Sequence, residues 1–479
     1  MTLQGLLRLD GRELGPKERS LLPAQAWSQG PVSLVGPTIV GGLAAWARFD
    51  GGSRPEQVAE RLALRGERAL PDLLGDFALA WWNGRRLLLA RDQLGIRPLY
   101  YLFRDPYFAF ASRLKTLLDL ARFEPRPDRR YLRAEFEFRQ GYKHHTPFLG
   151  IRRLMPGHFL WVESPFRPRR YWWPAPSAAP STRDWAGEAR RLLALAVRDR
   201  AAGAGLMLSG GLDSSALAAV LCSLQEQVPA VTAVPVHAGP GRDRTAVGHL
   251  LGQYPNLVHR DVDAREYRAD GGWMEEAFEQ LGYPVHPTYF MDRALARALV
   301  EMGANSVMNG FFGDATLSYS GRDSLRRLLA KGAWNQSLKL ISKLPWRSVF
   351  RPGQPWLQQM SERLLIGFQT LEHWVTMAAD LGVEMTFPFL DLRVVEFALS
   401  VPPQEFVRGG RPRSLLRRAF ADLPPEVVQR NDKVGYVSDY ADRIRMPAGR
   451  SEIEALRIGR QIVSGRFLSW LETGGPRDE

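Results

Sequence analysis

Cysteine is almost absent from this chain of 479 residues, which contains only Cys222. One cysteine excludes a disulfide framework and is typical of proteins in a reducing compartment. The eight histidines form no H-x-x-x-H or Cys/His pattern, so we expect no structural zinc site. Long apolar runs are missing too: no window approaches the ~18 apolar residues of a membrane span, and the first residues lack the apolar core of a signal peptide. We expect a cytoplasmic protein without a transmembrane segment.

Acidic residues are fewer than basic ones, 51 Asp and Glu against 64 Lys and Arg, which gives a net charge of +13. Such a charge attracts anionic ligands, nucleic acid or membrane surfaces without selecting among them. The arginines are scattered along the whole chain, so charge alone identifies no partner. The length predicts two to three domains.

Two kinds of pattern divide the chain. Short β-like runs with turn signals, such as residues 36–49, 75–92 and 157–164, fill the first part and predict a sheet-rich, antiparallel domain over residues 1–173. A segment rich in Pro, Ala and Ser follows at 174–182 and predicts a linker, after which residues 181–184 are expected to cap a helix. The second domain is then expected to span 181–479.

The second domain opens with alternating strand and helix patterns, which predict a parallel sheet with helical crossovers. The expected strands are 205–209, 230–237 and 306–310, and the expected helices are 214–224, which contains Cys222, and 287–303. The remainder of the chain is expected to be mostly helical.

The stretch SGGLDSS lies between the first of these strands and its helix. A glycine turn at a helix N-terminus exposes backbone amides that hold phosphate, and one carboxylate there suits the magnesium that accompanies pyrophosphate. No lysine precedes a hydroxyl, so it is not the G-x-x-x-x-G-K-[ST] loop. The alternative is a plain turn capped by Asp213 and Ser214. We expect the nucleotide to be bound by Ser209, Gly210, Gly211, Asp213, Ser214 and Ser215.

Several ordered stretches of the chain resemble the asparagine synthetase superfamily. They are SGGLDSS together with residues 75–101, 110–120, 146–160, 309–318, 383–402 and 423–436. The resemblance implies an α/β with α+β fold: an N-terminal glutaminase-like (Ntn) antiparallel β-sandwich, and a C-terminal PP-loop ATP pyrophosphatase-like parallel-sheet domain with a helical extension. It also implies ATP and Mg²⁺ as cofactors.

The matching stretches carry further site residues by resemblance. Asp314 matches a second magnesium-binding aspartate, beside Asp213. Lys433 matches a lysine that would stabilise the α-phosphate and the oxyanion, and Arg430 would either assist it or form a surface ion pair. Glu384 matches a glutamate that would orient Lys433 or deprotonate the attacking amine, or would instead form a buried structural ion pair.

The departures from the family pattern concern the source of the amine. Glutamine-dependent members begin with a nucleophilic cysteine, whereas Met1 is followed here by Thr2. An N-terminal threonine can act as a nucleophile, but the arginine-glycine-proline and asparagine-glycine-glutamate stretches that grip glutamine are also missing between residues 31 and 80. We expect the first domain to be a scaffold that makes no ammonia.

Two branches of the superfamily fit such a chain, the β-lactam synthetases and the lasso-peptide macrolactam cyclases. The former are known for a tyrosine three residues before the second aspartate, where this sequence has Phe311, and a phenyl ring cannot relay a proton. A basic, aromatic stretch at 316–360 is expected to be helical, and its Trp334, Trp346 and Trp356 would contact a peptide, fill the core or lie on a membrane surface.

The sequence therefore favours a cyclase that joins an Asp or Glu side chain of a precursor peptide to the peptide's own N-terminal amine, releasing AMP and pyrophosphate. The expected partners are the precursor peptide, a leader-binding protein and a leader peptidase, without nucleic acid. The alternative in the same class is an asparagine synthetase-like or β-lactam synthetase-like ligase acting on a small molecule. An RNA-modifying enzyme and a non-catalytic scaffold are further alternatives. Residues 75–160 argue against an RNA-modifying enzyme, and the site residues argue against a non-catalytic scaffold.

Overall fold

The computed structural model describes residues 2–121, 126–136, 143–175, 184–234, 242–263, 273–282, 289–320, 360, 364 and 368–430. Most of the predicted stretch at 316–360, with its three tryptophans, and the segment from 431 onward, with Lys433, lie outside these residues. No helix within the described ranges is long and apolar enough to cross a membrane.

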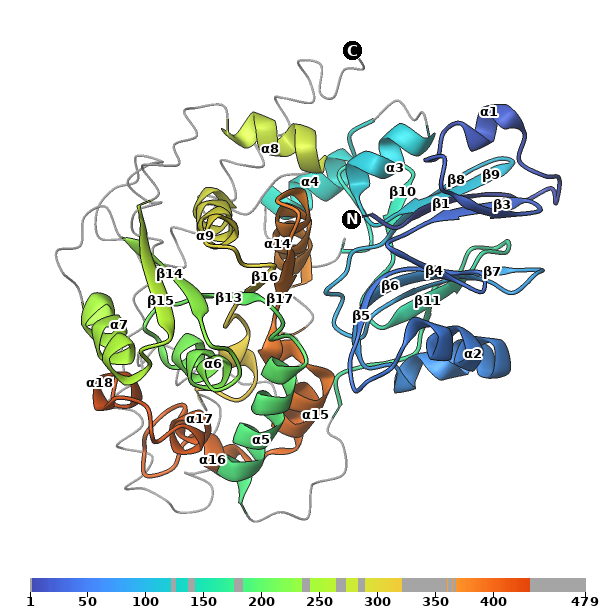
Figure 1. Ribbon diagram of the computed structural model, residues 1–479. Helices are drawn as coiled ribbons and strands as arrows, with labels where there is room; N and C mark the ends of the chain where they lie inside the picture. Colours follow the sequence, from blue (N-terminus) through green and yellow to red (C-terminus); the bar gives the residue numbers. More distant parts are fainter. Residues whose placement is uncertain are drawn as a thin grey trace.

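Two six-stranded antiparallel sheets face each other in the first domain (Figure 1). In spatial order, one sheet consists of β10 (Ile151–Arg153), β8 (Tyr100–Arg104), β9 (Tyr107–Ala111), β1 (Gln4–Arg8), β3 (Val32–Val35) and β2 (Trp27–Gln29). The other consists of β12 (Arg169–Arg170), β11 (His158–Trp161), β7 (Leu87–Arg91), β6 (Gly75–Trp82), β5 (Leu43–Phe49) and β4 (Thr38–Val40). The predicted antiparallel sandwich is confirmed.

Strand β6 is apolar without interruption from Phe77 to Trp82. Ala78, Ala80 and Trp82 point into the core between the two sheets, whereas Phe77 and Leu79 point into a second core on the opposite face. Successive side chains of a strand alternate between faces, and both faces of β6 are buried. The helices of this domain are α1 (Pro16–Arg19), α2 (Pro55–Arg65), α3 (Leu114–Ala121) and α4 (Arg129–Phe136), with the 3₁₀ helix η1 (Gly66–Asp72).

A five-stranded parallel sheet forms the centre of the second domain, as predicted. Its spatial order is β15 (Leu257–Asp263), β14 (Val228–Val234), β13 (Ala204–Met207), β16 (Ser306–Met308) and β17 (Glu384–Thr386). Helices α9 (Tyr289–Glu301) and α14 (Phe368–Asp380) cover one face, and α5 (Trp185–Arg198) and α6 (Leu212–Cys222) cover the other (Figure 1). The Asp184 side chain caps α5 by accepting a hydrogen bond from the Gly187 amide at 2.9 Å, within the segment predicted to cap it.

Further helices complete the described part of the second domain. They are α7 (Arg242–Gln253), α8 (Trp273–Leu281), α15 (Leu392–Ser400), α16 (Pro403–Phe406), α17 (Ser414–Ala419) and α18 (Pro425–Val428), with the 3₁₀ helices η3 (Gly313–Ala315) and η4 (Pro388–Leu390). Strand β17 was not predicted, because it falls in the part of the chain that was expected to be mostly helical. Its three residues form a strand by pairing with β16.

The two domains meet through buried ion pairs as well as apolar contacts. Arg200, which follows α5, lies 3.0 Å from Asp50 of the first domain and 2.8 Å from Asp391 of the second. The Asp391 side chain also accepts a hydrogen bond from the Arg393 amide at 3.0 Å and so caps α15. Burial of such charges is tolerated only when they are paired, so this cluster fixes the position of one domain on the other.

Candidate active site

The loop between β13 and α6 has the conformation that a phosphate-binding turn requires. Gly210 adopts a φ of 66°, in the left-handed region that favours glycine. The Ser214 hydroxyl closes the turn, since it accepts a hydrogen bond from the Ser209 amide at 3.2 Å and donates one to the Gly211 carbonyl at 3.2 Å. Ser209 Oγ lies 3.1 Å from the same hydroxyl. The predicted pyrophosphate cradle is thus a compact turn at a helix N-terminus, where amides and the helix dipole favour an anion.

Neither Asp213 nor Ser214 caps α6. The N-cap is Gly211, which makes no side-chain cap hydrogen bond, and both residues lie within the first helical turn after Leu212. The alternative that this stretch is a plain turn with two capping side chains is therefore wrong. Ser215 follows in the same turn, and its buried Oγ has no hydrogen-bond partner among the described residues.

Only one of the two oxygens of the Asp213 carboxylate accepts a hydrogen bond from a described residue. Its Oδ2 accepts a hydrogen bond from Arg413 Nη2 at 2.6 Å, and the same nitrogen lies 3.2 Å from Ser318 Oγ. Its Oδ1 is buried, and no described residue donates to it. A buried carboxylate oxygen without a donor is unfavourable unless a cation or ligand completes it. This oxygen fits the predicted role of Asp213 in binding magnesium.

The loop that carries Asp314 touches the first turn of α6. A Cβ on Gly313 would lie 2.6 Å from Asp213 Cγ, and a Cβ on Gly310 would lie 3.1 Å from the Ser214 amide nitrogen. Any side chain at Gly313 would overlap the carboxylate, so this approach requires glycine. The structure therefore brings Gly313, the residue before the half-buried Asp314 in η3, against Asp213.

Two carboxylates suit magnesium when phosphate oxygens and waters complete its coordination shell. In the described ranges, no three or more His, Cys, Asp and Glu side chains gather into a metal site. Two carboxylates would need further oxygens, such as those of a bound nucleotide, to complete the coordination shell of the ion.

Arg413, the residue that holds Asp213, was missed by the sequence analysis. It has a φ of 60°, which is uncommon for a residue with a side chain and is concentrated at functional sites. The signal was hidden because Arg413 belongs to an arginine-rich stretch, residues 408–418.

The segment that leads to Lys433 is anchored beside α6. Arg417 Nη1 donates to the Val428 carbonyl, and its Nη2 donates to the Arg430 carbonyl at 2.5 Å. Helices α17 and α18, on either side of this anchor, both contact α6. The backbone of Arg430, three residues before Lys433, is thus tied to α17, which contacts α6. Lys433 lies outside the described residues, and its catalytic role stays a prediction.

Glu384 lies apart from the phosphate loop. Glu384 pairs in register with Ser306, and Ser306 pairs with Ala204 on β13. Glu384 therefore lies level with Ala204, which is five residues before Ser209 of the phosphate loop. Its carboxylate forms an ion pair with the buried Arg97 of the first domain, and burial lowers the pKa of Arg97 to about 10. This is the ion pair that the sequence left open as the alternative to a catalytic role; proton transfer by Glu384 stays a prediction.

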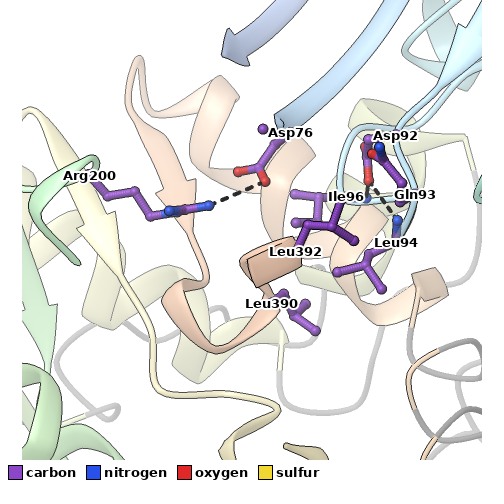
Figure 2. A pocket seen from close by; sticks show the side chains of 9 residues that line it. Asp76, Asp92, Gln93, Leu94, Ile96, Arg200, Leu390 and Leu392 are labelled. Carbon is purple, nitrogen blue, oxygen red and sulfur yellow. Dashed lines mark hydrogen bonds and ion pairs between the residues drawn. The ribbon is translucent and has the colours of Figure 1, made fainter. Parts of the chain in front are cut away.

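A small cavity between the domains is not the nucleotide site (Figure 2). Its volume of about 10 Å³ has room for roughly one water molecule. The Asp92 carboxylate at its wall accepts hydrogen bonds from the Leu94 and Ile96 amides at 3.1 and 2.9 Å, and Arg200 lies 3.8 Å from Asp76. The cavity is lined by Gly75, Asp76, Asp92, Gln93, Leu94, Ile96, Arg200, Leu390 and Leu392, none of them a predicted site residue.

The fold and the site together define a nucleotide-dependent ligase domain of the PP-loop type joined to a glutaminase-type domain. The family model for asparagine synthase matches residues 188–457, and the model for a glutamine amidotransferase domain matches residues 43–173. The first match covers more than half of the chain, and the chain belongs to the asparagine synthase family. It is an ATP-dependent amide-forming ligase of that family, whose members generally use Mg²⁺ with ATP.

Two named relatives show how distant the similarity is. The glutamine-hydrolyzing asparagine synthetase 3 of Bacillus subtilis is 23% identical over 431 residues, which is 77% of this chain and 68% of that protein. The amidase chyE of Penicillium rubens is 29% identical over 314 residues, or 59% of this chain, and the chain spans only 45% of its length. A solved glutamine phosphoribosylpyrophosphate amidotransferase from B. subtilis is 14% identical over 64% of this chain and 75% of its own, with a TM-score of 0.23, too low to support an argument.

Proposed function

We propose that this protein is an ATP-dependent peptide cyclase that closes the isopeptide macrolactam of a lasso peptide. The observation that carries the proposal is the environment of the chain's one cysteine. Cys222 ends α6 and is partly buried, and burial raises the pKa of its thiol to about 11. A thiol protonated at neutral pH is a poor nucleophile, so no cysteine of this sequence is available to release ammonia from glutamine. The proposal therefore takes the amine from the substrate itself rather than from glutamine.

The proposed reaction has two steps. A carboxylate oxygen of a substrate Asp or Glu side chain attacks the α-phosphorus of ATP, the bond between the α- and β-phosphates breaks, and pyrophosphate leaves. The nitrogen of the peptide's N-terminal amine then attacks the acyl carbon, the bond to AMP breaks, and the surplus proton of the amine is released. The products are one amide bond within the peptide, AMP and pyrophosphate.

The chain's own residues divide this work. Asp213 and Asp314 would hold magnesium, which neutralises charge on the leaving pyrophosphate. Lys433 would donate to the α-phosphate and to the oxyanion of the second step. Glu384 would reach the attacking amine only by giving up its ion pair with Arg97. The pyrophosphate would be held by Ser209, Gly210, Gly211, Ser214 and Ser215.

The same proposal assigns roles to Phe311 and to the partners of the protein. The phenyl ring of Phe311 stands where a proton-relaying tyrosine would be needed for β-lactam closure. The precursor peptide is the substrate, and a leader-binding protein and a leader peptidase would deliver it. No nucleic acid has a part in this reaction.

A small-molecule amide ligase is the second candidate. The similarity to the Bacillus subtilis asparagine synthetase favours it. The two functions differ in the acceptor: aspartate with ammonia in one case, and a peptide with its own amine in the other.

Mass spectrometry separates the two. The purified protein, its maturation partners, ATP and Mg²⁺ are incubated with the leader-free peptide encoded by a neighbouring gene, and in parallel with aspartate and ammonia. The cyclase should release AMP and pyrophosphate with the peptide and convert it to a product lighter by one water. Turnover of aspartate with ammonia, and no dehydration of any candidate peptide, would assign the small-molecule function instead.

A further inference from the structure

One large apolar side chain beside the phosphate loop is exposed. Phe311 lies between Gly310 and Gly313, both of which touch the first turn of α6, yet its own side chain is 41% exposed. None of the other exposed large apolar residues that the structure describes lies in the loops of the site. Single exposed apolar residues are common on protein surfaces, so position alone gives Phe311 no function.

The Phe311 ring is held in place by buried groups on three elements. It packs edge-on against Trp374 of α14, with ring centroids 4.5 Å apart, and Trp374 stacks on Phe387 at 5.8 Å. The Trp374 indole nitrogen donates to the buried Asp292 of α9 at 2.9 Å. The Phe311 amide donates to Asn309 Oδ1 at 2.9 Å and thereby fixes the loop. We name Phe311, Trp374 and Phe387 the aromatic ledge.

A rigid aromatic surface binds an apolar group with little loss of conformational entropy, because its own rings are already ordered. Phe311 shares its loop with Asp314, so a group that covers its ring would lie close to the proposed nucleotide site. Free aspartate carries no apolar group to cover the ring. A peptide supplies one whenever the residue beside its reacting Asp or Glu is aliphatic or aromatic.

We propose that the exposed face of Phe311 binds an aliphatic or aromatic side chain of the substrate peptide, adjacent in sequence to the carboxylate that is adenylated. This inference rests on the proposed peptide cyclase function and adds a specificity to it. Phe311 is a residue that selects the substrate rather than one that moves a proton.

Blocked tripeptides test the inference without the natural substrate. N-acetylated, C-amidated Phe-Asp-Phe and Ser-Asp-Ser have no free amine, so only the adenylation step occurs, and exchange of labelled pyrophosphate into ATP measures it. The proteins are the wild type, Phe311→Ala, Phe311→Tyr and Phe103→Ala. Phe103 is the matched control, since it is a phenylalanine of similar exposure, 45%, on β8 of the first domain.

The wild type should show a KM for Phe-Asp-Phe about two- to tenfold lower than for Ser-Asp-Ser, the range for one aromatic contact. Phe311→Ala should raise the KM for Phe-Asp-Phe to that for Ser-Asp-Ser, with kcat and the thermal unfolding temperature little changed. Phe311→Tyr should keep the preference because the ring remains, and Phe103→Ala should leave it unaltered.

Two results would overturn the inference: equal KM values for the two tripeptides in the wild type, or a preference that survives Phe311→Ala. In both, exchange with tripeptides leaves the peptide function standing. Exchange with free aspartate and with neither tripeptide would instead overturn the proposed function, and the specificity of Phe311 with it.

Discussion

Replacement of Glu372 by glutamine should disrupt the contact between the two domains. Glu372 lies on α14, and its side chain is 1% exposed. One carboxylate oxygen lies 2.9 Å from Arg91 Nη2, and the other lies 3.0 Å from Arg153 Nε and accepts a hydrogen bond from the Tyr100 hydroxyl at 2.9 Å. All three partners belong to strands of the first domain, so one carboxylate balances two buried guanidinium groups.

The expected loss of stability follows from the two buried guanidinium groups that Glu372→Gln leaves without a countercharge. Both arginines keep their hydrogen bonds to carbonyl oxygens, such as that of Arg91 Nη1 to Leu154 at 2.9 Å and that of Arg153 Nη1 to His145 at 2.7 Å. Neither carbonyl carries a countercharge. Removing one partner of a buried ion pair costs about 3–5 kcal/mol, and we expect Glu372→Gln to lower the free energy of unfolding by that amount.

The same helix offers a matched control. Asp380 of α14 also pairs with an arginine of the first domain, Arg113, but its side chain is 22% exposed. Partly exposed pairs contribute about 1 kcal/mol or less, so Asp380→Asn should be nearly neutral. Urea unfolding at pH 7, followed by tryptophan fluorescence and circular dichroism, compares both variants with the wild type. If Glu372→Gln were no more destabilising than Asp380→Asn, the interface charge would not hold the domains together.

Four further outcomes are expected. Asp213→Asn and Asp314→Asn should each abolish pyrophosphate release while the thermal unfolding curve is retained; normal release from either folded variant would remove that residue from the metal site. Lys433→Met should keep ATP binding, measured by calorimetry, but slow the chemical step by on the order of a hundredfold, and an unchanged rate would refute its role. The protein should release no ammonia from glutamine, and Thr2→Ala should not alter turnover; release that disappears in this variant would contradict the scaffold interpretation. Burial raises the pKa of Asp92 from 3.8 to about 6, so the folded state binds the proton more tightly and stability should fall as pH rises from about 4 to 6. The urea midpoint of the wild type should therefore decrease with pH over this range, and it should decrease less in Asp92→Asn. An equal decrease in both proteins would exclude Asp92 as the source.

Elements with a strong local pattern were predicted within three residues of their observed bounds. They are β13, α6, β14, α9 and β16. In each of them, an apolar pattern typical of one kind of element is bounded by glycine or polar residues. The phosphate loop was predicted for the same reason, because the sequence requirements of a glycine turn are local. Asp314 was assigned to the metal site by resemblance, and this stays a prediction; the structure shows the approach of the preceding Gly313 to Asp213.

The contacts between residues far apart in the sequence were not predicted. Nothing near Arg97 or Glu384 indicates that these residues form an ion pair across the domain interface, and periodicity reports only which face of an element is buried. Arg413 was missed because its neighbours are also arginines. Its position follows from the packing of α17 against α6, which no local pattern encodes.

The buried charges give the first domain a structural role that does not depend on a catalytic nucleophile. Glu384 begins β17, and its countercharge is Arg97; Arg200, which leads into β13, depends on Asp50. Without the first domain, Glu384 would lose its partner Arg97, and Arg200 would lose the carboxylates of Asp50 and Asp76. Both losses would fall next to two strands of the parallel sheet. One of those strands ends at the phosphate loop, and the other pairs with the strand that leads to Asp314. The first domain therefore supports the geometry of the ligase site by electrostatic pairing, whether or not it performs any reaction of its own.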